Sequence, residues 1–174
     1  AVQAWLVRGR IAGQEPEAAA NAVRLIHGLA GSILDGANLQ EVSLAREGLR
    51  GLQAAGCELR GANLEGCDLA GADLRRTRLD AARLAGACLA RAKLCEASFI
   101  AADLTVVEAD QVDLTDAVLR RATLRQSTWT DCVWTGVTLD EADVTGWAVF
   151  GPRGPIGAKR PPTLTAALAL GHAG

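Results

Sequence analysis

Hydrophobic residues recur at every fifth position from Leu34 to Val149. These 24 consecutive central positions hold 17 leucines, and no insertion interrupts their register. The residue two places before a centre is usually small, with 11 alanines, three cysteines, two serines and one threonine. Of the 11 glycines in residues 32–151, ten lie two places after a centre. The chain is therefore an internal repeat with a period of five.

A five-residue period fits neither of the regular secondary structures. On an α-helix, positions five apart diverge by about 140°, so the leucines would spread around the helix. On a flat strand, an odd step moves each successive leucine to the opposite face. Each unit must therefore contain its own turn, and the glycines mark its place. The pattern predicts a chain that winds so that every central residue points to one axis.

The unit resembles the A-(D/N)-L-x-x motif of the pentapeptide repeat family, as in Ala37-Asn38-Leu39 and Ala102-Asp103-Leu104. The resemblance covers residues 32–151 and implies an all-β solenoid, a right-handed quadrilateral β-helix with four units per coil and about six coils. It also implies that the central leucines form the core, among them Leu39, Leu64, Leu74, Leu84, Leu89, Leu104 and Leu124.

Charged residues support a coil of twenty residues independently of the resemblance. If residues i and i+20 are stacked, their charges should be complementary. Nine such pairs are charged at both ends, and only Glu96–Asp116 is like-charged. At a spacing of five there is no preference, with six opposite pairs and five like pairs. The opposite pairs are Glu58–Arg78, Arg60–Asp80, Asp73–Lys93, Arg76–Glu96, Arg83–Asp103, Lys93–Asp113, Arg120–Asp140 and Arg121–Glu141.

The two ends of the chain depart from the repeat. We expect residues 1–31 to be an N-terminal segment in which a helix over about 15–29 covers the first coil. Residues 1–12 are interpreted as a short strand or as the remnant of an upstream domain. Residues 152–174 are expected to be a linker followed by a C-terminal segment. The apolar residues Leu164, Leu168 and Leu170 either cap the last coil or form a dimer contact, because quinolone-resistance members of the family pair two rods through a C-terminal helix.

Composition limits the classes of protein that the chain can represent. Apolar residues make up 49% of it and aromatic residues only 3%, so the core consists of leucine, valine and alanine. The net charge of −2 excludes a wholly basic nucleic-acid-binding surface. The sequence predicts neither a membrane span nor a signal peptide, and five cysteines without CxxC favour a reduced, cytoplasmic protein. Because the sequence contains no methionine, we expect it to be either trimmed or a piece of a longer protein, and its high content of Ala, Gly and Arg with little Lys favours a bacterial source.

No set of catalytic groups can be assembled from the sequence. It contains neither a GxGxxG nor a GxxxxGK[ST] loop, and His27 and His172 lie in the two end segments. Cys57, Cys67 and Cys132 occupy the small inward position, where cysteine acts as a larger alanine. We therefore predict no enzyme activity, no cofactor and no metal site.

Surface charge is the remaining functional signal. Residues 94–149 hold 10 acidic and 3 basic residues. Six acidic residues are predicted to gather where two faces of the rod meet, and we call this set the acidic corner. It is interpreted either as an interaction surface or as an ordinary solvated face. Its members are Glu96, Glu108, Asp110, Asp113, Asp116 and Asp131.

Two functions fit these observations. The first is a rigid, non-enzymatic scaffold that binds another protein and does not contact nucleic acid or membrane directly. The second follows from the resemblance, because family members that protect DNA gyrase and topoisomerase IV from quinolones resemble acidic rods that mimic DNA. A homodimer through the C-terminus would place two acidic halves side by side. The basic cluster from Arg75 to Lys93 weighs against the second function.

Overall fold

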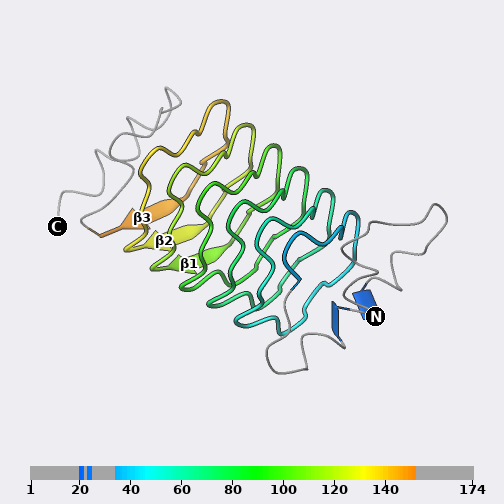
Figure 1. The fold of residues 1–174 in the computed structure, drawn as a ribbon. Coiled ribbons are helices and arrows are strands. Elements are labelled where there is room, and N and C mark those ends of the chain that lie inside the picture. The colour runs from blue at the N-terminus through cyan, green and yellow to red at the C-terminus, as the bar shows by residue number, and fades with distance from the viewer. Residues whose placement is uncertain (1–19, 22, 25–33, 152–174) are drawn as a thin grey trace, which may run out of the picture.

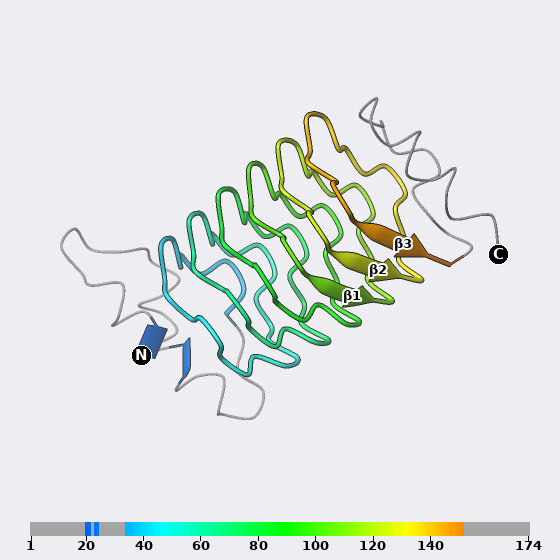
Figure 2. The ribbon, with the colours of Figure 1, turned by 180° about the vertical axis from the view of Figure 1, so that it is seen from behind.

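The computed structural model describes residues 20–21, 23–24 and 34–151. Residues 34–151 wind into a stack of similar coils, with residue 34 at one end of the stack and residue 151 at the other (Figure 1). The same stack seen from behind has no layer of helices on either side (Figure 2). The fold is a right-handed quadrilateral β-helix, as the resemblance of the repeated unit implies.

Each unit of the stack pairs with the unit twenty residues further along the chain. Parallel bridges join Asn38 to Glu58, Glu58 to Arg78 and Arg78 to Ser98, and the same offset holds on all four faces. Within one unit, the amide of Leu84 donates to the carbonyl of Asp103 at 2.7 Å, and the amide of Arg83 donates to the carbonyl of Ala62 at 2.9 Å. The twenty-residue coil is confirmed.

Every unit turns through a residue in the left-handed backbone region, two places after its centre. At the unit centred on Leu84, Gly86 has a φ of 68°, and the amide of Ala87 donates to the carbonyl of Leu84 at 2.9 Å. Glycine is favoured in this region because it has no Cβ. In 34–151, 14 non-glycine residues adopt it as well. The stacked backbone therefore imposes the turn even where the side chain opposes it.

The Asp or Asn of the motif has a structural role at the position before the centre. The Oδ1 atom of Asp103 accepts a hydrogen bond from the amide of Thr105 at 2.9 Å, and Asn63 and Asp143 cap the same amide in their units at 3.2 and 3.0 Å. This amide lies at the turn and points along the surface, so the side chain provides its acceptor. A short polar side chain can form this bond, and this explains the preference of the motif for Asp or Asn.

Three short strands lie side by side on one face of the stack, β1 (Glu108–Asp110), β2 (Thr128–Thr130) and β3 (Ala148–Phe150) (Figure 1). They pair in parallel, with Glu108 opposite Thr128 and Thr128 opposite Ala148. Within the described stack, the units centred on Ala109 and Trp129 lack the hydrogen bond that closes the turn elsewhere. This face therefore has a more extended backbone at these two units. We call it the fourth face; its centres are Leu49, Leu69, Leu89, Ala109, Trp129 and Val149.

The interior is filled by the central residues and the small residues before them. Leu84 and Leu89 are fully buried, and so are the larger Phe99, Trp129 and Trp134. Trp134 packs edge-on against Trp129 and Trp147, with ring centroids 5.1 and 5.5 Å away. The predicted core leucines named above are all buried, with at most 2% of their surface exposed.

Polar residues at the small inward position bond to the coil before them. The thiols of Cys57 and Cys67 donate to the carbonyls of Leu34 and Leu44 at 2.9 and 2.7 Å, and the hydroxyl of Thr77 donates to the carbonyl of Ala54 at 3.1 Å. Burial raises the pKa of Cys57 to about 12. These side chains are structural, and their polar atoms are satisfied inside the core.

The end segments fall mostly outside the described residues. The predicted capping helix over 15–29 is described only at residues 20–21 and 23–24, which are helical, and Ala20 and Val23 are buried. The C-terminal contact predicted for Leu164, Leu168 and Leu170 lies outside the described residues altogether. None of the helical residues that the structure describes forms a segment long and apolar enough to cross a membrane.

Candidate functional site

The acidic corner spans the fourth face and the next face in the chain, the first, with Asp131 at the turn between them and Glu96 and Asp116 at the turn beyond the first face. The first face has the centres Leu34, Ala54, Leu74, Leu94, Leu114 and Trp134. Glu108, Asp110 and Asp131 belong to the fourth face, and Glu96, Asp113 and Asp116 belong to the first. The fold therefore brings the six predicted residues to two adjacent faces and to neighbouring coils.

Two of the six carboxylates are already occupied by neighbours in the chain. Asp113 accepts hydrogen bonds from the hydroxyl and the amide of Thr115 at 2.6 and 3.0 Å. Burial raises the pKa of Asp113, but the hydrogen bonds from Thr115 and Cys95 together lower it by more than burial raises it. The pKa of Asp113 therefore lies below its ordinary value. Glu96 forms an ion pair with Arg76 at 3.8 Å. These two residues contribute less free charge to the corner than the sequence alone suggests.

The other four carboxylates have no such partner. Among the described residues, Glu108, Asp110, Asp116 and Asp131 form neither an ion pair nor a hydrogen bond through their side chains. Asp35 and Asp80 stand at the position that Asp110 has in its unit, and they accept hydrogen bonds from the amides of Ala55 and Ile100 at 2.9 and 3.2 Å. The free charge of the corner therefore comes from these four residues.

Two glycines that the sequence analysis did not single out leave room for two of these carboxylates. Asp116 and Asp131 are in the left-handed region, with φ of 58° and 51°, and each folds over the glycine twenty residues further on. A Cβ at Gly136 would clash with the carboxylate of Asp116, and one at Gly151 would clash with that of Asp131. An aspartate at the turn followed by glycine at i+20 is the sequence signal that reveals this arrangement.

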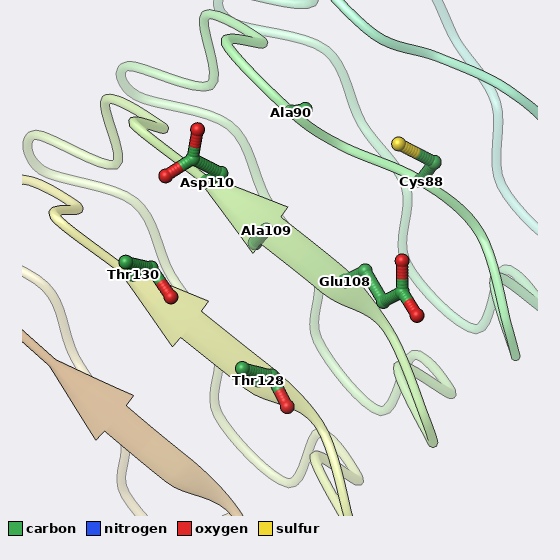
Figure 3. Close-up of a pocket in the computed structure, with 7 residues that line it drawn as sticks. All are labelled: Cys88, Ala90, Glu108, Ala109, Asp110, Thr128 and Thr130. Carbon is green, nitrogen blue, oxygen red and sulfur yellow. The ribbon is translucent and has the colours of Figure 1, made fainter.

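A shallow hollow of about 250 Å³ lies on the fourth face beside the corner. Figure 3 shows Glu108 and Asp110 on β1, between Cys88 and Ala90 of the preceding coil and Thr128 and Thr130 of β2. The side chains of the flanking coils are short, so the surface is low between them. The sequence analysis did not predict this hollow. The feature of the sequence that indicates it is the pair of short residues on both sides of the centres Leu89 and Trp129.

The basic cluster from Arg75 to Lys93 is largely paired within the rod. Arg75 holds Asp73 through two hydrogen bonds of 2.8 and 2.6 Å, and this contact lowers the pKa of Asp73. Arg78 pairs with Glu58 at 2.9 Å, and Arg83 pairs with Glu65. These three arginines are therefore paired locally, whereas Arg91 and Lys93 form no ion pair in the described stack and lie one coil before the acidic corner.

Four of the eight predicted ladder pairs form ion pairs in the described stack, namely Glu58–Arg78, Arg60–Asp80, Arg76–Glu96 and Arg121–Glu141. The expectation was incomplete, because three further pairs have a spacing of eighteen. They are Arg50–Asp68, Glu65–Arg83 and Arg125–Asp143. In each, a residue one place after a centre meets the residue one place before the centre on a neighbouring coil.

The cysteines and carboxylates near this surface raise the questions of metal binding and of thiol reactivity. Within them, no three His, Cys, Asp or Glu side chains are grouped so that they could hold a metal ion. Burial raises the pKa of Cys132 to about 11, and the negative charges of Asp110 and Asp131 contribute to that increase. Burial likewise raises the pKa of Cys95 to about 11, with Asp113 adding to the effect. These two thiols are therefore protonated at neutral pH and are poor nucleophiles.

The fold and the repeated unit define a solenoid protein whose side chains fill its own interior. The model of the family described as pentapeptide repeats matches residues 57–94, 82–121 and 117–146, which together span just over half of the chain. The chain belongs to the pentapeptide repeat family. Proteins of this family are generally non-enzymatic structural or interaction modules. None of the curated proteins matches the chain.

Several solved structures are similar to this chain. The pentapeptide repeat protein Rfr23 of the cyanobacterium Cyanothece 51142 is 25% identical over 67% of this chain and 86% of its own, with a TM-score of 0.46. Full-length QnrB1, a plasmid-mediated fluoroquinolone resistance protein, is 15% identical over 82% of this chain and 83% of its own, with a TM-score of 0.47. HetL, involved in heterocyst differentiation regulation in Nostoc, is 22% identical over 68% and 78%, with a TM-score of 0.26.

Proposed function

We propose that this protein is a rigid, non-enzymatic interaction module that binds another protein through its acidic corner. The observation that carries the proposal is the uneven pairing of charge. Carboxylates elsewhere on the rod mostly bond within the chain, whereas Glu108, Asp110, Asp116 and Asp131 do not. A surface whose charges have no internal partner is available for an oppositely charged partner.

The rigidity of the rod supports the same proposal. Each unit is tied to the neighbouring coils by backbone hydrogen bonds, such as those from Leu104 to Thr123 at 2.7 Å and from Asp103 to Ala82 at 2.9 Å. The backbone that carries the acidic corner is therefore fixed before a partner arrives. A preformed surface loses little conformational entropy on binding, and this favours affinity.

Photo-crosslinking at two matched positions tests the proposal. Gln111 and Ala101 are both exposed and both occupy the left-handed turn, with φ of 56° and 57°. Gln111 precedes Asp131 by one coil at the turn between the fourth and first faces, whereas Ala101 lies at the diagonally opposite turn, between the second and third faces. With p-benzoylphenylalanine at either position, we expect a discrete adduct with a cellular protein from position 111 and none from 101. Equal adducts, or adducts from 101 alone, would reject the acidic corner as the binding surface.

DNA gyrase or topoisomerase IV stays a second candidate partner. The same four free carboxylates would present negative charge to a basic DNA-binding surface of such an enzyme. A supercoiling assay with and without a quinolone tests this function. Inhibition or drug rescue that is lost in Asp110→Lys and Asp116→Lys would support it, and no effect at a large excess of the protein would reject it.

A further inference from the structure

The hollow on the fourth face has the size and the lining of a subsite for one side chain. Its volume of about 250 Å³ is below the range of pockets that hold drug-sized ligands. Ala90 and Cys88 supply an apolar lining beside the backbone of Ala109, whose side chain is buried in the core, and Thr128 and Thr130 close the opposite side (Figure 3). The two carboxylates of β1 stand in the middle of this surface, so an occupant must match both the apolar lining and the negative charge.

The contrast within the fourth face shows that these charges are not used internally. Asp68, two coils earlier and at the position that Glu108 has in its unit, accepts hydrogen bonds from the amide of Ala70 at 3.1 Å and from Arg50 at 2.9 Å. In the described part of the chain, the side chains of Glu108 and Asp110 accept neither kind of bond. They lie on the open side of the strand and are available to a cation from outside.

Resting on the proposed interaction function, we propose that this hollow receives the side chain of an arginine presented by the partner protein. The guanidinium carries five N–H donors in a planar fork and can bond both carboxylates, one from each end of β1. Its alkyl stem covers the apolar lining that a compact ammonium ion would leave exposed. An arginine anchored in a shallow pocket is typical of residues that dominate protein interfaces.

Amide chemical shifts of the full chain, titrated with N-acetylarginine amide at low ionic strength, test this inference. The matched probe is N-acetylcitrulline amide, which has the same shape without the charge. We expect the amides of Ala109, Thr128 and Thr130 to shift with the arginine probe only. Glu108→Gln/Asp110→Asn should reduce the initial slope of the titration about 2- to 30-fold, because two exposed ion pairs are lost.

Two further variants distinguish binding in the hollow from nonspecific attraction to negative charge. Ala90→Leu fills the hollow but keeps both carboxylates, and it should lower the slope to that of the citrulline probe. Asp140→Asn removes an exposed carboxylate on another face and should leave the slope unchanged. Equal shifts with both probes, or shifts that survive Ala90→Leu and the double variant, would overturn the inference. If the arginine probe causes no shifts but the crosslinks at Gln111 form, the subsite is rejected and the interaction surface is not. If the shifts occur but no crosslinks form at Gln111, the interaction surface is rejected.

Discussion

Leu84 lies in the middle of the stack and offers the sharpest test of the packing. It is fully buried, and the backbone ladder places it between Leu64 and Leu104 of the neighbouring coils. Leu84→Ala removes three carbon atoms from this column. The lost burial costs ~2.4 kcal/mol at ~0.8 kcal/mol per carbon. A residual cavity of ~40 Å³ adds ~1 kcal/mol, so the expected loss is ~3–4 kcal/mol.

Urea unfolding followed by circular dichroism measures this loss. Thr105→Ala is the matched control, because Thr105 is part of the neighbouring coil on the same face but is half-buried and points outward. We expect the control to stay within ~0.5 kcal/mol of the unchanged chain. Leu84→Asp should abolish the cooperative transition, since it buries an unpaired carboxylate. A Leu84→Ala variant as stable as the control, or a Leu84→Asp variant that still melts cooperatively, would refute the assignment of Leu84 to the core.

Three further predictions concern single features of the coil. Asp103→Ala should lower stability by ~1 kcal/mol in urea melts, because the amide of Thr105 loses its acceptor, whereas Asp103→Asn keeps that acceptor and should be near neutral. Ala101→Gly should raise Tm by ~1–4 °C, since Ala101 has a φ of 57°, and Ala85→Gly, outside the left-handed region, should lower it. Burial raises the pKa of Cys57 from 9.0 to about 12, so the unfolded chain loses its proton first and stability falls as the pH rises through that range. Cys57→Ala should flatten this alkaline decline in urea midpoints, and an unchanged decline would exclude Cys57 as its cause.

The coil could be predicted from the sequence because the five-residue repeat that determines its geometry is uninterrupted. With no insertion between Leu34 and Val149, one register fixes which residues point inward and which residues stack. Opposite charges at a spacing of twenty residues then indicated the length of the coil. The eighteen-residue pairs, such as Arg50–Asp68 at 2.9 Å, were missed because they join different positions of two units. Long side chains reach along the face as well as straight to the next coil.

The candidate site could be predicted only in part. The sequence placed the six acidic residues on two adjacent faces, but it could not show that Asp113 is held by Thr115 at 2.6 Å while Glu108 is free. That difference depends on side-chain reach, since a short Asp before a centre bonds the turn amide and a longer Glu does not. The hollow exists because the side chain of Ala90 is short, and a search for sequence motifs does not detect where short side chains leave a hollow.

The most direct test of the central claim combines the crosslinking comparison with neutralisation of the corner. The crosslinker at Gln111 is examined in the unchanged chain and in Glu108→Gln/Asp110→Asn/Asp131→Asn, with Ala101 as the matched position. We predict that the adduct from position 111 forms in the unchanged chain and is lost in the triple variant, while circular dichroism shows both folded. An adduct that persists in the folded triple variant would contradict the claim that this protein binds its partner through the acidic corner.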